Sequence, residues 1–410
     1  MRIHNGRSAV ALVFSAFLPV APVWAASDWD NYQGNAQHTG FVAQSFKPAK
    51  FRQVWQWTSP HAADGVMRFI NPVTMAGGLI AVTDDDYFSP QALYVLDELT
   101  GQVQWAHEFP ADTPALNPPT LHDGHVSVAT SGHEATYMHQ FDAQSGALLW
   151  KTPFSAQWEH YLAPLVGRGT VNTNGGYYGG LYTFKSKTGV QRSFTSLPQV
   201  DLYTPATDGV NNYVYAGDAL YIINRDSGAV TSIVDPAPSY TGGYSYIGAP
   251  IVTQRQRVLA LSGENFSGRA SASTGGYYDR SVVSFDLQGK TLEWRSADLY
   301  TTQPALANGL VFAGSRTPLR LAAMDETSGR VQWSWTPTDG ASQFCRNVIA
   351  TKTHVFVSTD RAVHAIDLNT HQSVWSIPIP GELALSATGT LTINEGCGES
   401  TGRMVAVRLK

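Results

Sequence analysis

A motif that recurs along most of the chain limits its fold more than any other feature. An alternating apolar stretch is followed by Asp-x-x-Ser/Thr-Gly and by a second short stretch ending in Trp, in residues 92–105, 137–150 and 320–333. Variants of this plan occupy residues 181–194, 220–233, 282–294 and 363–375. The Asp and hydroxyl side chains can hydrogen-bond the turn backbone, and the Gly supplies a positive φ. Each segment is therefore predicted to be a β-hairpin.

A second hairpin precedes each of these. Residues 71–82 contain a Gly-Gly turn, and residues 303–313 contain an Asn-Gly turn. Four antiparallel strands in roughly 40 residues are typical of one blade of a β-propeller. We name the strands of a blade A to D, from the axis to the rim.

The two ends of the chain are predicted to share the last blade. Seven complete units lie between residues 69 and 375, whereas residues 382–410 supply three strands, over 383–387, 390–394 and 403–409. Phe-Arg-Gln-Val-Trp-Gln-Trp-Thr at 51–58 matches Arg-Val-Gln-Trp-Ser-Trp-Thr at 330–336. We expect an all-β, eight-bladed propeller whose last blade is closed by the N-terminal strand, which leaves no exposed inner edge.

The predicted propeller spans residues 51–410, after a lead segment at 26–50 and a signal peptide at 1–25. Arg2 and Arg7 precede an apolar stretch at 9–20, and Val23-Trp-Ala25 supplies a cleavage site after Ala25. No Cys stands at this site, so a lipid anchor is not expected, and no later segment is apolar enough to cross a bilayer. The predicted location is the periplasm or the extracellular space.

Tryptophans share one register position in six of the predicted blades. We expect these side chains to pack between neighbouring blades: Trp55, Trp105, Trp150, Trp294, Trp333 and Trp375.

The repeat resembles a known family. Its Tyr-x-Leu-Asp-x-x-Thr-Gly-x-x-x-Trp pattern, and Trp29-Asp-Asn-Tyr-Gln-Gly-Asn-Ala-Gln-His-Thr-Gly40 before the first blade, are similar to the pyrroloquinoline-quinone-type propeller repeat. That family includes quinoprotein alcohol dehydrogenases and the propeller lipoprotein of the outer-membrane barrel-assembly machinery. The resemblance covers residues 29–410 and is specific for the fold rather than for a function.

Charge excludes one class of partner. Charged residues make up 14 % of the chain, with 27 basic against 32 acidic residues and no basic block. A nucleic-acid partner is therefore not expected. A monomer is expected.

One mouth of the predicted channel is the candidate binding face, because strand-A starts and strand-B ends meet there. Aromatic, His and Arg residues gather at these positions. A protein or carbohydrate ligand would contact Tyr87, Trp158, Tyr177, Tyr178, Tyr244, Tyr246 and Asn347. The alternative is a solvated loop surface whose tyrosines pack the turns. A Gly- and Ser-rich insertion in blade 5, between residues 261 and 282, falls on the same face as a lid or as a neutral loop.

Both cysteines fall at this mouth. Cys345 starts strand A of blade 7, and Cys397 ends strand B of blade 8. A disulfide between them is predicted, with a free redox pair as the alternative.

Catalytic alternatives are open but weaker. A polysaccharide lyase acting on a uronate polymer needs a cation and a proton-transferring Tyr or His. These could come from His133, His160, Tyr161, Tyr203, Arg316 and Arg346.

A quinoprotein oxidoreductase is the other alternative, and the resemblance then implies a vicinal Cys-Cys pair. The chain has no such pair, so neither the quinone nor calcium is expected. Asp84, Asp85 and Asp86 are weak calcium candidates, which we interpret as a solvated acidic loop. The sequence therefore favours an exported binding or scaffolding module without a catalytic cofactor.

Overall fold

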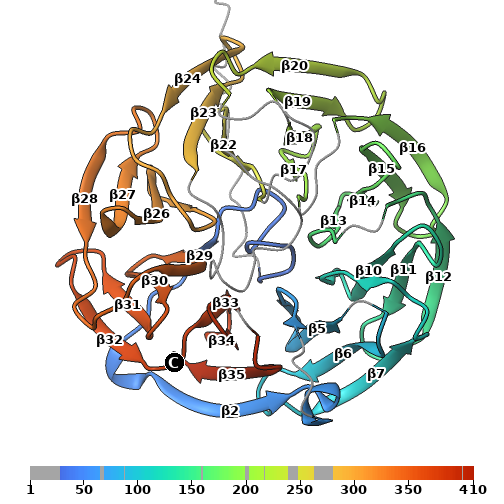
Figure 1. The fold of residues 1–410 in the computed structure, drawn as a ribbon, viewed down its shortest axis with the longest axis horizontal. Helices are drawn as coiled ribbons and strands as arrows, with labels where there is room; N and C mark the ends of the chain where they lie inside the picture. The colour runs from blue at the N-terminus through green and yellow to red at the C-terminus, as the bar shows by residue number, and fades with distance from the viewer. Residues whose placement is uncertain are drawn as a thin grey trace, which may run out of the picture.

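Eight sheets stand around a central axis (Figure 1). This computed structural model describes residues 28–64, 69–86, 88–157, 160–198, 203–216, 218–238, 248–262, 280–398 and 400–410. Its antiparallel, mostly four-stranded sheets confirm the predicted eight-bladed propeller.

The blades follow one another in chain order. Blade 1 contains β3 (Phe69–Ile70), β4 (Thr74–Ala76), β5 (Leu79–Asp85), β6 (Gln91–Asp97) and β7 (Val103–Phe109). Blade 2 contains β8 (Ala115–Leu116), β9 (Thr120–His122), β10 (His125–Ser131), β11 (Tyr137–Asp142) and β12 (Leu148–Pro153). Blade 3 contains β13 (Leu165–Gly167), β14 (Thr170–Asn174), β15 (Gly180–Lys185) and β16 (Gln191–Ser196). Blade 4 contains β17 (Ala206–Thr207), β18 (Asn211–Ala216), β19 (Ala219–Asn224) and β20 (Val230–Val234).

The second half repeats the plan. Blade 5 contains β21 (Ile251–Val252), β22 (Arg257–Ser262), β23 (Ser281–Asp286) and β24 (Thr291–Arg295). Blade 6 contains β25 (Ala305–Ala307), β26 (Leu310–Arg316), β27 (Leu319–Asp325) and β28 (Val331–Trp335). Blade 7 contains β29 (Phe344–Thr351), β30 (His354–Thr359), β31 (Val363–Asp367) and β32 (Ser373–Ile377). Blade 8 contains β33 (Gly381–Leu385), β34 (Thr390–Glu395) and β35 (Arg403–Arg408), with β2 (Arg52–Thr58) as its outer strand.

Ring closure follows the prediction. β2 pairs antiparallel with β35, from Arg52 opposite Arg408 to Thr58 opposite Arg403. The first and last strands of the ring thus belong to one sheet, as the adjacent blue and red strands show (Figure 1). The hydrogen bonds of one sheet join the two ends of the chain.

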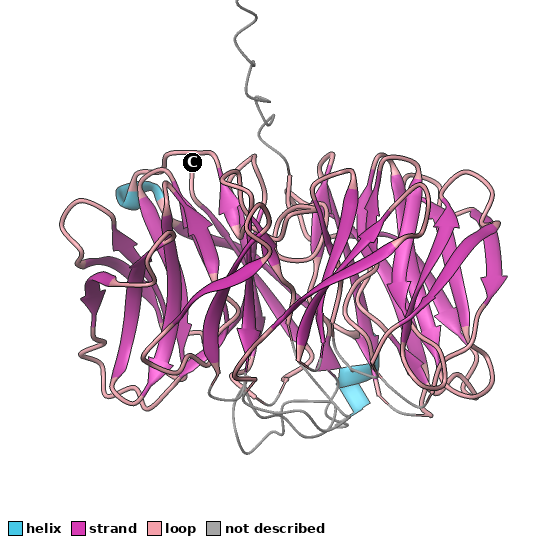
Figure 2. Cartoon of the chain, turned by 90° about the horizontal axis from the view of Figure 1, so that it is seen from above, coloured by secondary structure: helices cyan, strands magenta, loops and turns pink. Residues whose placement is uncertain are grey.

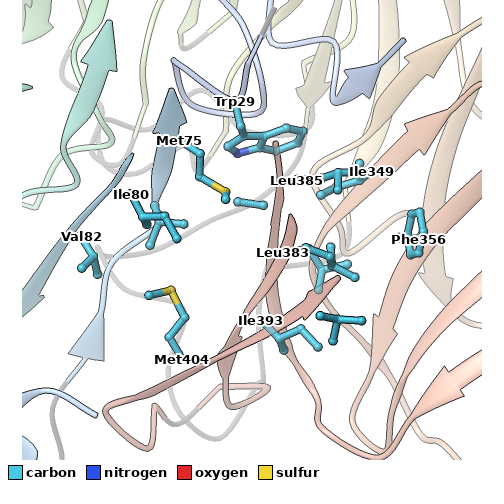
Figure 3. Packing of buried hydrophobic residues seen from close by; sticks show 14 of the residues in the cluster. Trp29, Met75, Ile80, Val82, Ile349, Phe356, Leu383, Leu385, Ile393 and Met404 are labelled. Carbon is cyan, nitrogen blue, oxygen red and sulfur yellow. The ribbon is translucent and has the colours of Figure 1, made fainter. Parts of the chain in front are cut away.

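Packing between blades uses the inner strands. Residues of β5 and β6 are almost all buried, whereas β7 alternates between exposed and half-buried positions. The largest apolar cluster joins blades 7, 8 and 1, and Figure 3 shows Trp29 beside Met75 and Leu385 in it. Burial of these apolar faces is the main stabilising contribution to such a ring.

The repeat turns of blades 1, 2, 3 and 6 pack against the tryptophan of the preceding blade. The Asp97 carboxylate accepts bonds from Thr100 N (2.8 Å) and Thr100 Oγ1 (2.8 Å), and Gly101 has φ +70°. Trp55 Nε1 donates to Glu98 O (3.0 Å), and a Cβ on Gly101 would lie 2.6 Å from the Trp55 ring. Glycine therefore meets two requirements here, a left-handed backbone and a close approach.

The same contact recurs around the ring. Trp105, Trp150 and Trp294 donate to the next turns in the same way, at Ala143 O, Ser186 O and Glu326 O. The predicted packing between blades is confirmed at these positions.

The strands run between two faces of a disc (Figure 2). We call the end of the channel with the A–B turns the turn mouth. We call the end with the strand-A starts and B–C loops the loop mouth. Two short 3-10 helices flank β2, η1 (Pro48–Lys50) before it and η2 (Pro60–Asp64) after it.

Candidate functional site

The lead segment closes the turn mouth. Residues 28–44 wind around the axis and meet all eight blades. The first part of the segment contacts blades 8, 1, 2 and 3, in that order. The contacts are Ala387 N to Asp28 Oδ1 (3.3 Å), Met75 N to Trp29 O (2.7 Å), His122 Nδ1 with Asp30 Oδ2 (2.7 Å), and Val166 N to Asn31 Oδ1 (2.9 Å).

The second part of the segment accepts main-chain hydrogen bonds from blades 4, 5, 6 and 7, in that order. The bonds are Thr207 N to Ala36 O (2.9 Å), Val252 N to Gln37 O (3.1 Å), Leu306 N to Thr39 O (2.7 Å), and Ala350 N to Gly40 O (2.8 Å).

A short strand extends this contact. β1 (Phe41–Val42) pairs parallel with β29, with Phe41 opposite Ala350. The segment forms at least one hydrogen bond with every blade. It can therefore make all of its contacts only when the ring is complete.

Polar side chains of the segment fill the axis below the turn mouth. Gln33 Nε2 donates to Val348 O (2.9 Å), and Asn347 Nδ2 donates to Gln33 Oε1 (3.0 Å). His38 is buried and its Nδ1 lies 3.1 Å from Pro250 O. Burial lowers the pKa of His38 to about 3, although the bond to Pro250 O opposes this shift. His38 is therefore neutral and donates to Pro250 O.

Little space is left beside these groups. A cavity of about 10 Å³ is lined by Trp29, Gln33, Asn347 and Glu382 among others. This is about the room that one water molecule needs. Burial raises the pKa of Glu382 to about 6, and the Arg346 charge opposes the rise.

The described residues beside the lead segment leave no room at the axis for the quinone that the fold family implies. Pyrroloquinoline quinone is a rigid tricyclic molecule with several carboxylates, and the cavity at the described axis holds about one water molecule. Among the described residues, no group of three or more His, Cys, Asp and Glu side chains could hold a metal ion. No step of a mechanism is therefore derived through either group.

The acidic run at the loop mouth differs from the solvated loop that we expected. Asp84 is fully buried, and it accepts bonds from Ala92 N (2.8 Å), Ser59 Oγ and His61 Nδ1 (2.8 Å). The solvated interpretation is wrong for Asp84 because the residues after β2 return to blade 1 and cover it.

Asp85 is buried in the same way. It accepts a bond from Leu116 N (3.2 Å) and pairs with His160 Nε2 (2.8 Å). The solvated interpretation is wrong here as well, since blade 2 and the loop after it cover the carboxylate. Asp86, in contrast, is half-buried.

The residues of the lyase alternative are spread around the ring. His133 belongs to the B–C loop of blade 2, whereas Arg316 and Arg346 belong to blades 6 and 7. Tyr203 is buried and its hydroxyl donates to Gly180 O (3.0 Å), and burial strongly raises its pKa. Tyr161 is buried as well, and its N–H donates to the side-chain oxygen of Asn117.

Part of the predicted binding face lies together at blade 3. Tyr177 is half-exposed, Tyr178 is almost fully exposed, and the His133 ring lies 5.6 Å from the Tyr177 ring. Asn347, in contrast, is buried in the channel wall. The predicted residues Tyr87, Trp158, Tyr244 and Tyr246 lie outside the described residues, as does most of the blade 5 insertion, 263–279.

The predicted disulfide is present. Cys345 and Cys397 are bonded, with their Cα atoms 5.1 Å apart. It joins β29 of blade 7 to the B–C loop of blade 8 at the loop mouth.

Sequence reasoning missed the role of the lead segment. The available signal was the Trp29–Gly40 motif, whose Gly40 has φ +60° and lies against Ala305 and Val348. A motif of this kind outside the repeat indicates a structural task that the repeat cannot perform.

Comparison with known proteins now identifies the family. A family model described as outer membrane protein assembly factor BamB matches residues 89–377, well over half of the chain. The chain belongs to this family. A comparison with curated protein sequences found no match.

Solved structures share the BamB-family fold. The crystal structure of BamB from Moraxella catarrhalis matches with a TM-score of 0.64 and 13 % identity, over 87 % of this chain and 99 % of that chain. A europium-containing methanol dehydrogenase matches with a TM-score of 0.58 and 13 % identity, over 94 % and 99 % of the two chains. At these identities the likeness shows the fold alone. In the described part of the chain, no helix has the length and hydropathy that a membrane span requires.

Proposed function

We propose that this protein is a protein-binding scaffold of the cell envelope that assists the assembly of outer-membrane proteins and uses no catalytic cofactor. Membership of the BamB family supports the assembly role. The single observation that carries the scaffold function is the filled axis. The lead segment fills the channel axis from the turn mouth, and the cavity left beside it has room for about one water molecule.

The surface that remains for a partner is the loop mouth. There, carboxylates such as Asp84 and Asp85 are used in internal bonds that hold the loops. Aromatic side chains such as Tyr178 are exposed on the same face. Such a surface suits binding better than proton transfer, because its buried ionisable groups already have partners.

The test is made in the native host. Depletion of the chain is expected to lower the amount of folded β-barrel proteins in the outer membrane, measured by their heat-dependent mobility on gels, and the full chain restores it. The purified chain is also incubated with uronate polymers, and separately with alcohols, the quinone, calcium or a lanthanide and a redox dye. Unchanged barrel levels, or turnover in either assay, would contradict the proposal.

A further inference from the structure

Three consecutive blades each place an aromatic ring on the surface of the loop mouth. The B–C loop of blade 1 carries Phe88 (53 % exposed), that of blade 2 carries the exposed His133, and that of blade 3 carries Tyr177 (43 %) and Tyr178 (84 %). We call these four residues the aromatic arc. Exposed aromatic side chains that gather in this way mark interaction sites more often than single exposed apolar residues do.

The arc is continuous across a blade boundary. The His133 and Tyr177 rings lie 5.6 Å apart and are tilted by 31°. The B–C loops on the other side of the mouth differ, since Arg316 ends β26, Arg361 lies between β30 and β31, and Glu395 ends β34. Among the described B–C loops, those of blades 1 to 3 are therefore aromatic, whereas those of blades 6 to 8 carry charged residues.

The backbone has an unfavourable conformation at Phe88 and close to His133. Phe88 has φ +52°, which is rare for a residue with a large side chain, and its N–H donates to Pro114 O (3.2 Å). Ala135, two residues after His133, also has φ +52°. Strained residues of this kind are frequent at binding sites, where the surrounding fold maintains them.

The B–C loop of blade 3 is anchored by hydrogen bonds to residues that follow blade 2. Gly176 N donates to Ser155 O (2.6 Å), and the Tyr177 carbonyl accepts a bond from Gln157 Nε2. The two tyrosines are thus presented by an anchored turn, which lowers the entropy cost of binding.

The charge of the surroundings indicates the partner. Asp86 is half-buried, and Asp112 and Glu134 are exposed. The loop sequences 84–90, 110–114, 131–136, 154–164 and 174–179 contain no Lys or Arg. A cation approaching this face therefore meets carboxylates and the faces of aromatic rings together.

The chain itself contains a cation placed over an aromatic ring. Lys151 Nζ lies 3.8 Å from the centre of the Tyr137 ring, at the edge of blade 2. We propose that the aromatic arc binds an extended protein segment in which Lys or Arg alternates with large apolar side chains. This inference rests on the proposed scaffold function, because it names the chemistry of the bound partner.

The test uses defined peptides and the full chain. A fluorescein-labelled twelve-residue peptide with alternating Lys and Val is titrated with protein, and fluorescence anisotropy reports binding. Matched peptides replace Lys by Glu, or Val by Ser. We expect saturable binding of the Lys-Val peptide, weaker binding of both others, and weakening by salt because the carboxylates are exposed.

Variants locate the site. Tyr178→Ala and Glu134→Lys are each expected to weaken binding on the order of 5-fold, which corresponds to about 1 kcal/mol. Leu99→Ala removes an exposed apolar side chain (61 %) from a C–D turn on the opposite face and is the matched control, with no change expected. Circular dichroism verifies that each variant is folded.

Several results would overturn the inference. These are no saturable binding of the Lys-Val peptide, equal binding of the Glu peptide, or equal loss in Leu99→Ala. Tighter binding of a uronate oligosaccharide, or of anionic phospholipid vesicles, would assign the arc to a different partner. If depletion lowers barrel assembly in the host while the peptides fail to bind, the arc proposal falls and the scaffold function stands.

Discussion

The two mouths of the channel are stabilised by different kinds of contact. At the turn mouth, one continuous segment meets all eight blades, largely through main-chain bonds such as Leu306 N to Thr39 O and Ala350 N to Gly40 O. At the loop mouth, separate loops are held by individual side-chain pairs, such as His160 with Asp85 and Cys345 with Cys397.

The difference explains where variation is tolerated. A segment bonded to every blade cannot change at one position without loosening its neighbours. Loops that are each held by a few bonds can change one at a time. Binding surfaces are usually built on loops that a rigid scaffold holds, so the loop mouth is the end suited to a partner.

The largest effect is expected at the centre of the turn mouth. Trp29→Ala removes a buried ring that packs against Met75, and it should lower the free energy of unfolding by about 3–5 kcal/mol. Hydrogen exchange should show faster exchange of the strand-A amides of Thr207 and Leu306, whose acceptors lie in the segment. Trp335→Ala, at the rim of blade 6, is the control. Unchanged exchange at the two amides would show that the segment does not act as a unit.

The disulfide is the corresponding test at the loop mouth. Replacing Cys345 and Cys397 together by Ala opens a link between residues separated by 52 positions, and should lower the free energy of unfolding by about 2–4 kcal/mol. Denaturant unfolding measures the loss. Because the bond lies at the other end of the channel, exchange of the Leu306 amide should remain as in the parent. Faster exchange of the Leu306 amide would show that the two mouths are not stabilised independently.

Two glycines with the same backbone conformation separate the effect of close packing against the ring from the effect of backbone strain. Gly40 and Gly77 share φ near +60°, but a Cβ on Gly40 would lie 2.9 Å from Ala305 Cβ, whereas nothing lies within 4 Å at Gly77. Gly40→Ala should lower the free energy of unfolding by about 2–3 kcal/mol, against about 1 kcal/mol for Gly77→Ala. Equal losses in denaturant unfolding would mean that backbone strain alone is measured.

Acid should weaken the turn mouth through His38. Its pKa is about 3 in the folded chain and 6.5 in the unfolded chain, so between these values the unfolded state binds the extra proton. Stability therefore falls as the pH decreases below 6.5, on the order of 2 kcal/mol at pH 5 from this group. His38→Gln keeps a donor for Pro250 O and should lose less stability between pH 7.5 and pH 5. Equal losses in the parent and the variant would refute this assignment.

The smallest expected effect is the pH dependence from His122, which lowers stability as the pH rises rather than as it falls. Hydrogen bonding to Asp30 raises the pKa of His122, although burial opposes the rise. The stability from this pair is therefore fully present below the unfolded pKa and is lost as the pH rises through the folded pKa. Asp30→Asn should cost more at pH 5 than at pH 8 in denaturant unfolding. The same cost at both values would show that the pair carries no charge.

Much of the propeller fold could be predicted from local sequence patterns. The turn from Asp97 to Gly101 bonds to itself, so its residues specify it without reference to the rest of the chain. The match between residues 51–58 and 330–336 located β2 in blade 8 for a related reason, since strands with the same pattern occupy the same register. The disulfide was predicted from the same blade assignment, which places both cysteines at one mouth on adjacent blades.

Burial of polar groups could not be predicted in this way. Asp84 and Asp85 look like solvated carboxylates in the sequence, yet their partners His61 and His160 come from different parts of the chain. The route of residues 28–44 was hidden as well, because their acceptors and donors lie on eight separate blades.

The sequence alone determined the repeating blade, the number of blades and the strand that closes the ring, because each depends on hydrogen bonds and burial periods that recur locally. Only the tertiary structure decided which mouth is sealed, which carboxylates are buried and which aromatic rings share a surface. The physical reason is that these features depend on contacts such as Gln33 with Val348, 315 positions apart, which exist only after the ring has formed.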